Sequence, residues 1–285
     1  MIQDLLNKRL PNSMETQLID VNKAYLSDNL ELLRKIGSQV IDLIYIDPPF
    51  CSEEDYIEFS DKWESVSGYI GYMRERILEM HRLLKKTGSF YLQCDSHAKF
   101  ELKLLCDKIF GRNNFRREII WNTGSVSGFK SRVKGWIRQH DTILYYTKSN
   151  DFTFNKLYIP YSINYIEKMF KYKDDDGRVY RKRRNGKQYL DEGKGVPIGT
   201  VWDDILSFQT RTRAKEYFKY PTQKPLGLMK RIILASSNEN DIVADFFCGS
   251  GTTIIAAKME KRNFIACDNN PHAIELCKKR LRGLN

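Results

Sequence analysis

Residues 40–50 read VIDLIYIDPPF, and this stretch decides the fold class. Its first part is an almost continuous apolar run rich in branched side chains, which is typical of a strand buried on both faces of a sheet. The run ends at Asp47, because the two prolines that follow cannot donate to a strand ladder and hold the backbone at a fixed φ. The sequence therefore predicts that Asp47, Pro48, Pro49 and Phe50 lie at the carboxyl end of a central strand.

Helical and strand patterns alternate on both sides of this stretch. Apolar side chains recur at helical spacing over residues 69–84, with Gly88 as the expected helix stop, and residues 89–93 read as the next strand. Ser96 is the expected cap of the helix that follows. Alternation of this kind predicts an α/β fold. Further strands are predicted at 118–121, 141–147, 241–247 and 263–267.

Composition excludes several classes of protein. The chain has 285 residues, of which 41% are hydrophobic and 29% charged, so it can bury a core without disulfides or a structural metal. Its six cysteines form no Cys-x-x-Cys pair and lie far in sequence from the four histidines, so no metal site is expected. No apolar run approaches the roughly 18 residues of a membrane span, and the start lacks the layout of a signal peptide. We expect a cytoplasmic protein without a membrane partner.

The net charge of +11 is concentrated in two stretches. Residues 112–148 hold eight basic and two acidic residues, and residues 171–190 hold eight basic and three acidic ones. A solvated charge run is the alternative explanation for either stretch alone. Because aromatic residues are interleaved with both, the pattern favours a face that meets nucleic acid.

Residues 245–253 read DFFCGSGTT, between a predicted strand and a predicted helix. Glycines here permit a tight turn and close approach of a ligand, and the helix start offers unpaired N–H groups. The loop is not a dinucleotide fingerprint, since Ile254 takes the place of the third glycine, and it lacks the lysine of a phosphate-binding loop. Asp268, at the end of the next strand, can accept from both hydroxyls of a ribose. The ligand that fits is a nucleoside cofactor with a charged tail other than pyrophosphate.

The other half of the predicted site is the stretch from Asp47 to Phe50. Asp47 and the Pro48 carbonyl can each accept one N–H of an exocyclic amino group, while Phe50 stacks on the flat heterocycle that carries it. A plain turn after a strand is the alternative. The apolar strand before the prolines and the glycine loop on another strand end favour a binding site.

Three motifs in this order resemble those of the amino-group DNA methyltransferases. Residues 47–50 resemble the catalytic motif, although Phe50 stands where Tyr is commoner, and residues 245–251 resemble the Phe-x-Gly-x-Gly cofactor motif. Residues 221–225, PTQKP, are similar to the motif that opens the helix before the cofactor loop. Because the catalytic motif comes first in the chain, the order resembles the β class of the family.

The resemblance implies a fold and a division of the chain. The fold is the Rossmann-like fold of S-adenosylmethionine-dependent methyltransferases, in circularly permuted order, with an inserted target-recognition region. Residues 1–149 would form the catalytic half of the methyltransferase domain and residues 201–285 the cofactor-binding half. Residues 150–200, where the periodicity is lost, would be the inserted region.

The resemblance also implies roles for single residues. Asp245, Phe247, Gly249 and Gly251 would hold the methionine part of the cofactor, Asp268 its ribose, Lys224 its carboxylate end and Asp28 its adenine edge. A helix cap is the alternative role of Asp28. The residues expected to contact DNA are Arg132, Lys134, Arg138, Arg181, Lys182, Arg183 and Arg184.

The activity implied is methyl transfer from S-adenosylmethionine to the N6 amino group of adenine in a specific duplex sequence, by base flipping and direct displacement. A cognate restriction endonuclease and a homodimer are the expected protein partners. Cytosine N4 is the first alternative target, although the family more often has Ser at the position of Asp47 in such enzymes. A non-catalytic DNA-binding subunit is the second alternative. RNA is disfavoured because no stacking module is evident.

Overall fold

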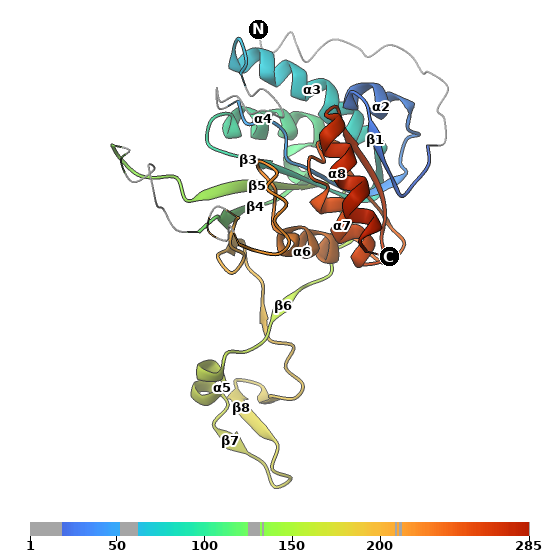
Figure 1. Ribbon diagram of the computed structural model, residues 1–285. Helices are drawn as coiled ribbons and strands as arrows, with labels where there is room; N and C mark the ends of the chain where they lie inside the picture. The colour runs from blue at the N-terminus through green and yellow to red at the C-terminus, as the bar shows by residue number, and fades with distance from the viewer. Residues whose placement is uncertain are drawn as a thin grey trace. The chain divides into compact units, whose positions relative to one another are not determined.

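The computed structural model describes residues 19–51, 62–124, 132, 134–208, 210 and 213–284. The chain divides into two compact units, one made of Met1–Asn155 with Thr200–Asn285 and the other of Lys156–Gly199. The first unit is α/β, as predicted (Figure 1). None of the helices in the described part of the chain is long and apolar enough to cross a membrane.

The first unit is built on an eight-stranded sheet in the order β1-β13-β12-β2-β3-β5-β4-β11. Only β5 runs against its neighbours β3 and β4, and the remaining pairs are parallel. All six residues of β2 are buried, as the apolar run predicts for a central strand. The strands are β1 (Lys23–Leu26), β2 (Ile41–Ile46), β3 (Leu84–Cys94), β4 (Phe115–Asn122), β5 (His140–Thr147), β11 (Val201–Trp202), β12 (Ile242–Asp245) and β13 (Asn263–Asp268).

Helices cover both faces of this sheet (Figure 1). On one face lie α2 (Asn29–Lys35), α3 (Val66–Leu83) and α4 (Lys99–Phe110), which is followed by a 3₁₀ turn, η1 (Arg112–Asn114). On the other face lie α6 (Leu226–Ser236), α7 (Thr252–Met259) and α8 (Pro271–Arg282). Apolar side chains of α3 such as Met73 and Ile77 are fully buried and belong to the main hydrophobic core, together with side chains of β2, β3 and α4.

Two local expectations were wrong. Gly88 does not stop a helix: α3 ends at Leu83 and β3 begins at once, so Gly88 lies inside a strand. A Cβ there would approach the Asp42 carbonyl oxygen to 3.1 Å, so close packing against β2 explains the glycine. Ser96 does not cap α4: the helix begins after Ala98 without a side-chain cap, and the Asp95 carboxylate accepts from the His97 amide at 2.9 Å in the turn before it.

The order of the strands places four aspartates along one edge of the sheet. The neighbours β1, β13, β12 and β2 are parallel, so their carboxyl ends lie together. Asp268 and Asp245 are the last residues of β13 and β12, Asp47 follows β2 directly, and Asp28 lies two residues beyond β1. Ligands of open α/β sheets bind outside the carboxyl ends of the strands. The sheet therefore forms an acidic edge where a ligand is expected.

The second unit is small and rich in aromatic side chains. It contains α5 (Ile163–Met169), a two-stranded pair of β6 (Tyr158–Ile159) with β10 (Val196–Pro197), and an antiparallel sheet of β7 (Tyr172–Lys173), β8 (Val179–Arg183) and β9 (Gly186–Tyr189). Phe170, Tyr180 and Arg181 are its buried residues. This unit lies within the predicted insertion, 150–200, where the helical and strand periodicity is lost.

Candidate active site

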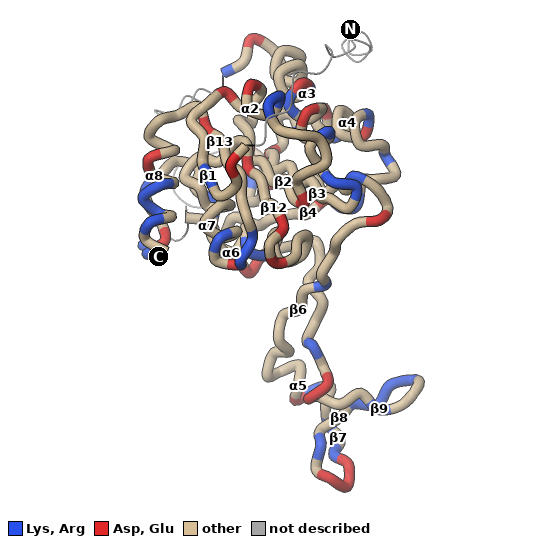
Figure 2. Tube along the Cα trace, turned by 90° about the vertical axis from the view of Figure 1, so that its right-hand side faces the viewer, with Lys and Arg blue, Asp and Glu red and all other residues tan. Residues whose placement is uncertain are grey.

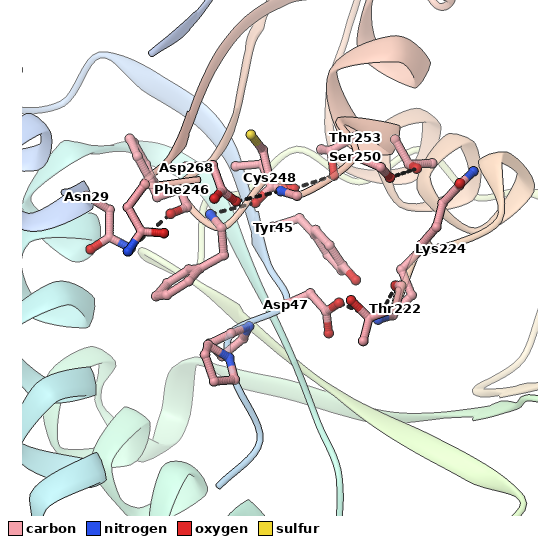
Figure 3. Close-up of a pocket in the computed structure, with 18 of the residues that line it drawn as sticks. Asn29, Tyr45, Asp47, Thr222, Lys224, Phe246, Cys248, Ser250, Thr253 and Asp268 are labelled. Carbon is pink, nitrogen blue, oxygen red and sulfur yellow. Dashed lines mark hydrogen bonds and ion pairs between the residues drawn. The ribbon is translucent and has the colours of Figure 1, made fainter. Parts of the chain in front are cut away.

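A pocket of about 350 Å³ lies at the acidic edge of the sheet (Figure 3). Its lining includes all four aspartates, the Pro-Pro-Phe segment and residues of the glycine loop. The structure thus brings together every catalytic and cofactor residue predicted from the sequence except Gly251, which lies at the start of α7 directly behind the loop. The rest of the lining includes aromatic rings, among them Tyr45, Trp63, Tyr72 and Tyr220.

Asp47 has one engaged and one unengaged carboxylate oxygen. Its Oδ2 forms an ion pair with Nζ of Lys224, whereas its Oδ1 is buried and has no hydrogen-bond partner among the described residues. Burial raises the pKa of Asp47 above its usual value, although the Lys224 ammonium acts in the opposite direction. A buried acceptor without a partner is costly unless a ligand donates to it. Asp47 is therefore prepared to accept an N–H group.

The residues after Asp47 form one wall of the pocket. Pro48 is buried, Pro49 and Phe50 are partly exposed, and all three line the cavity. The Phe50 ring centroid lies 5.7 Å from Nζ of Lys224. The aromatic ring and the ion-paired carboxylate are therefore close enough to act on one planar ligand.

The glycine loop depends on backbone angles that side chains disfavour. Gly249 has φ of 46° and Gly251, the N-cap of α7, has φ of 78°. A Cβ on Gly251 would lie 2.5 Å from Sγ of Cys277, so the loop also packs too closely for a side chain there. Glycine therefore suits both the backbone angles and the close packing of this loop.

Asp245 is held under the loop by two hydrogen bonds. Its Oδ1 accepts from the Phe247 amide at 3.0 Å and its Oδ2 from Oγ1 of Thr253 at 2.5 Å. Burial raises the pKa of Asp245 to about 7, and the two hydrogen bonds oppose that rise only in part. A carboxyl group with such a pKa changes charge near neutral pH.

Asp268 joins the loop to the next strand. Its Oδ2 accepts from the Gly249 amide at 2.8 Å and its Oδ1 from the Asn270 amide at 2.9 Å. Burial raises the pKa of Asp268, and these amides counteract the rise. Since both bonds come from the backbone, the carboxylate has a fixed orientation at the pocket wall.

Asp28 is a helix cap and also a pocket residue. Its Oδ1 accepts from the Leu30 and Glu31 amides at 2.8 and 3.2 Å, so the alternative reading of a cap for α2 is confirmed. Its Oδ2 pairs with the Arg76 guanidinium at 3.0 Å. Capping uses one oxygen, and the residue still lines the pocket.

Arg76 and Asn29 are site-supporting residues that sequence reasoning missed. The Arg76 guanidinium lies 3.3 Å from the Tyr72 ring centroid and donates through Nε to the Asn29 side chain at 2.6 Å. Asn29 in turn donates to the Phe246 carbonyl at 2.9 Å, which joins α2 and α3 to the glycine loop. No sequence spacing indicates this, because Asn29, Arg76 and Phe246 lie far apart in the chain.

A second missed feature is a buried polar chain behind Asp47. The Tyr45 hydroxyl donates to Gln93 at 2.6 Å, and Gln93 donates to Asp141 at 2.8 Å. Arg138, predicted to contact DNA, forms ion pairs with Asp141 at 3.6 Å and with Asp95. The tyrosine in a mostly aliphatic strand was the one signal for this chain.

The other basic residues differ in exposure. Arg132 and Lys134 are exposed in the first unit. In the second unit Lys182, Arg183 and Arg184 are exposed, whereas Arg181 is only 5% exposed. The Arg181 guanidinium is therefore an internal group of its unit.

The pocket fits a nucleoside cofactor with a cationic tail. Asp268 presents a fixed carboxylate at the end of a strand, which suits ribose hydroxyls. Asp245 and the glycine backbone would face the charged methionine end of S-adenosylmethionine, and a buried carboxyl is a partner for its ammonium or sulfonium. The unpartnered Oδ1 of Asp47 leaves an acceptor for the second substrate.

Comparison with known sequences agrees with this geometry. The profile of the N6/N4 methyltransferase family, described as DNA methylase, matches residues 41–279. The chain is 32% identical to the DNA adenine methyltransferase YhdJ of Escherichia coli, over 89% of this chain and 80% of that protein. It is 30% identical to the type II methyltransferase M1.MboII of Moraxella bovis, over 89% of this chain and 94% of that protein.

Comparison with solved structures confirms the fold. The M1.HpyAVI–SAM complex matches with a TM-score of 0.58 and 21% identity, over 91% of this chain and 98% of that one. The cytosine-N4-specific PvuII DNA methyltransferase matches with a TM-score of 0.59 and 17% identity, over 90% and 85% of the two chains. The Rossmann-like methyltransferase fold predicted from the motifs is therefore correct, while the circularly permuted order stays a prediction. The chain belongs to the DNA methylase family that modifies amino nitrogens, with S-adenosylmethionine as the cofactor.

Proposed function

We propose that this chain methylates the N6 amino group of adenine within a specific sequence of duplex DNA. The observation that carries the proposal is Asp47, whose buried Oδ1 has no hydrogen-bond partner in the described part of the chain. It lies beside Pro48, Pro49 and Phe50 in the pocket that also holds the cofactor residues. The Escherichia coli relative, named an adenine methyltransferase, supports adenine as the target.

The proposed chemistry uses position and electrostatics. The amino nitrogen of adenine is a poor nucleophile because its lone pair is delocalised into the ring. Acceptance of its two N–H groups by Asp47 Oδ1 and the Pro48 carbonyl favours a pyramidal nitrogen with a directed lone pair. Phe50 stacks on the base and holds its plane. S-adenosylmethionine, when bound, supplies the electrophilic methyl group.

Lys224 has a second part in this proposal. Its ammonium engages Oδ2 of Asp47, so that oxygen is occupied while Oδ1 stays available. The ion pair opposes the rise in the pKa of Asp47 that burial causes, and so favours the ionised form. An ionised Asp47 can accept from the amino group, whereas a protonated one would offer a weaker acceptor. The role expected for Lys224 at the carboxylate end of the cofactor belongs to the proposal as well.

The target base has to leave the duplex. An amino group engaged in a base pair is out of reach of a pocket wall, so the adenine is flipped out at a cost of a few kcal/mol. Exposed basic residues such as Arg132, Lys134 and Lys182 contact the phosphates and hold the register of the duplex. We therefore propose base flipping and sequence selection together.

Two alternatives make different predictions. Cytosine N4 methylation uses the same geometry, and a cytosine-N4-specific enzyme has the same fold. A non-catalytic DNA-binding subunit would bind DNA without transferring a methyl group. Asp47, in place of the Ser commoner in N4 enzymes, favours adenine.

The biological setting is proposed from the relatives. M1.MboII is named a type II methyltransferase, and another relative is the Mod subunit of the Salmonella type III enzyme StyLTI. We expect a cognate restriction endonuclease that recognises the same sequence. A homodimer and a cytoplasmic location stay predictions, which light scattering and fractionation test.

The test is to incubate the purified chain with mixed-sequence duplex DNA and methyl-labelled S-adenosylmethionine, and then to identify the labelled nucleoside. N6-methyldeoxyadenosine is expected. Label on N4 of deoxycytidine would show that cytosine and not adenine is the target base. Cofactor binding without any labelled nucleoside would favour the non-catalytic subunit. Asp175→Ala, which removes a carboxylate from an exposed turn of the second unit, is the matched control for acidic substitutions in the pocket.

A further inference from the structure

The β8–β9 hairpin of the second unit has two chemically different faces. Arg181 pairs with Gln188 and Arg183 with Gly186 across the strands, so these side chains share one face. The pairs Tyr180 with Tyr189 and Lys182 with Lys187 form the other face. We call the first the arginine face and the second the lysine face.

Side chains on the arginine face form a continuous chain of contacts. The Arg181 guanidinium is buried, donates to the Tyr165 hydroxyl and lies 5.0 Å from the Phe170 ring centroid. Its Nε donates to Oε1 of Gln188 at 2.9 Å, and the same oxygen accepts from Nε of Arg183 at 2.9 Å. The buried arginine therefore orients Gln188, and Gln188 orients the exposed Arg183.

Arg183 presents its outer edge to solvent. Only its Nε is engaged, and within the described residues its two terminal nitrogens have no hydrogen-bond or ion-pair partner. A guanidinium with a fixed plane and two free N–H groups matches the O6 and N7 acceptors of guanine, the commonest specific contact in the major groove. Holding the side chain in place beforehand lowers the conformational entropy lost on binding.

Lysines on the other face have a different arrangement. Nζ of Lys182 lies 4.5 Å from the Tyr172 ring centroid, and Nζ of Lys187 lies 4.6 Å from that of Tyr180. An ammonium on a flexible stem acts as a point charge without a planar fork. The lysine face therefore suits phosphates, which carry charge but no sequence information.

Charge around the hairpin favours a polyanion. Residues 179–189 contain five basic and no acidic residues. The nearby acidic groups Asp191 and Glu192 are both paired with Arg178, at 2.9 and 2.7 Å. Figure 2 shows the acidic β7–β8 turn and the basic β8–β9 turn as separate ends of this unit. The field at the hairpin tip is thus positive.

A hollow of about 480 Å³ adjoins the arginine face. Tyr158, Tyr161 and Tyr165 line it together with Arg181, Arg183 and Gln188. Gly195 lines the hollow and packs closely against β6, since a Cβ on this residue would lie 2.2 Å from the Ile159 carbonyl oxygen. Arg183 therefore lies at an open, concave surface where the edge of a base pair can approach it.

We infer that Arg183 determines specificity by reading a guanine in the major groove, with Gln188 and Arg181 as positioning residues. A two-stranded β-ribbon fits that groove. The inference rests on the proposed function for its DNA substrate, and it adds which residue reads a base and which base it reads.

The test uses the full-length chain and a pool of duplexes with randomised sequence. Bound duplexes are selected and sequenced, which requires no methyl transfer, and methylated positions are mapped in parallel with labelled cofactor. The unmodified chain is expected to select a sequence that contains at least one G·C pair. Arg183→Lys keeps the charge and removes the fork, and it should lower the preference at one such pair by about 10- to 100-fold while sparing the others.

Two further variants separate reading from charge. Gln188→Ala should relax the preference at the same base pair by a smaller factor, because Arg183 loses its anchor. Lys182→Ala should keep the selected sequence and weaken binding evenly, with a salt slope smaller by about one. Unchanged preference in Arg183→Lys, or an even loss like that of Lys182→Ala, would overturn the inference.

Failure of the proposed function gives a different result. If the chain selects a sequence but transfers no methyl group, the function is wrong and the Arg183 variants still test the inference. If the chain methylates adenine in a specific sequence but Arg183→Lys leaves every base preference unchanged, the function holds and the inference falls.

Discussion

The two units of this chain hold their charged side chains in different ways. In the first, acidic side chains lie at the ends of buried strands, and backbone amides hold most of them, as the Gly249 and Asn270 amides hold Asp268. Asp47 is the exception, since it pairs with the Lys224 side chain. In the second, cationic side chains lie on a short hairpin, and other side chains hold them, as Gln188 holds Arg183. Chemistry on a weak nucleophile demands fixed groups away from water, whereas sequence reading demands donors that reach out into a groove.

The difference predicts how each unit responds to change. A group oriented by the backbone can be altered only by disturbing the sheet edge, since the strand ends decide its position. A side chain that is oriented by other side chains can be substituted with little effect on the surrounding structure. The pocket should therefore tolerate few substitutions, and the hairpin should change specificity without loss of cofactor binding.

Asp47→Ala should have the largest effect. It removes the acceptor for the target amino group, and transfer should fall by about 1000-fold or more, because this oxygen is one of only two proposed acceptors. Cofactor affinity, measured by titration calorimetry, should change little. Transfer above a tenth of the original rate would remove Asp47 from the catalytic role.

Gly251→Ala should damage the cofactor loop. The new Cβ meets Sγ of Cys277 at 2.5 Å, and the backbone has φ of 78°, which costs an L-residue about 1–2 kcal/mol. Cofactor affinity should fall by roughly 10- to 100-fold. Gly71→Ala is the control, since a Cβ there meets no atom within 4 Å and alanine favours the interior of α3. Equal cofactor affinities in the two variants would show that the close approach at Gly251 is unimportant.

Arg181→Ala should loosen the second unit and leave the first unchanged. Loss of the buried guanidinium removes one of the two donors to Gln188 and the cation among the surrounding rings, and DNA affinity should fall by about tenfold. Hydrogen exchange should rise within residues 156–199 and stay unchanged in α6, α7 and α8. Arg184→Ala, in the exposed turn, should leave exchange as it is. Faster exchange throughout both units would contradict their independence.

A smaller effect is expected from pH. Because burial raises the pKa of Asp245 to about 7, the carboxyl is largely protonated at pH 6 in the cofactor-free protein and gains charge as the pH rises. A cationic methionine end prefers the ionised form, so cofactor affinity should increase about fivefold from pH 6 to 7.5.

Asp245→Asn should flatten this dependence of affinity on pH. Because the pKa of Asp245 is raised in the folded chain, folding favours the neutral form of this carboxyl. The free energy of unfolding without cofactor should therefore fall as the pH rises through about 7. Thermal melting at several pH values checks the sign. An affinity that rises equally in the variant would assign the titration to another group.

Sequence patterns predicted most of the first unit because its signals are local. The apolar run before Asp47 predicted a central strand, and β2 is buried throughout. The predictions for Gly88 and Ser96 were wrong for a common reason: a glycine can serve close packing as well as a helix stop, and a helix such as α4 can begin without a side-chain cap. Local propensity does not distinguish these cases.

The supporting contacts could not be predicted in the same way. Arg76 reaches Asp28 from a helix nearly fifty positions away in sequence, and Lys224 reaches Asp47 across 177 positions. Arg181 was expected at DNA and is a buried group of its unit. A run of basic residues predicts that some cations meet a polyanion, but burial within the unit decides which ones.

By itself, the sequence determined the strand ends, the glycine loop and the family, because these depend on residue type at short spacing. Only the tertiary structure decided that Asp28, Asp268, Asp245 and Asp47 share one edge, since that follows from the order of strands in the sheet. It also decided which oxygen of Asp47 stays without a partner among the described residues, and that Arg183 is held by Gln188. The physical reason is that hydrogen bonds and burial depend on distances in space, which residue spacing along a chain does not specify.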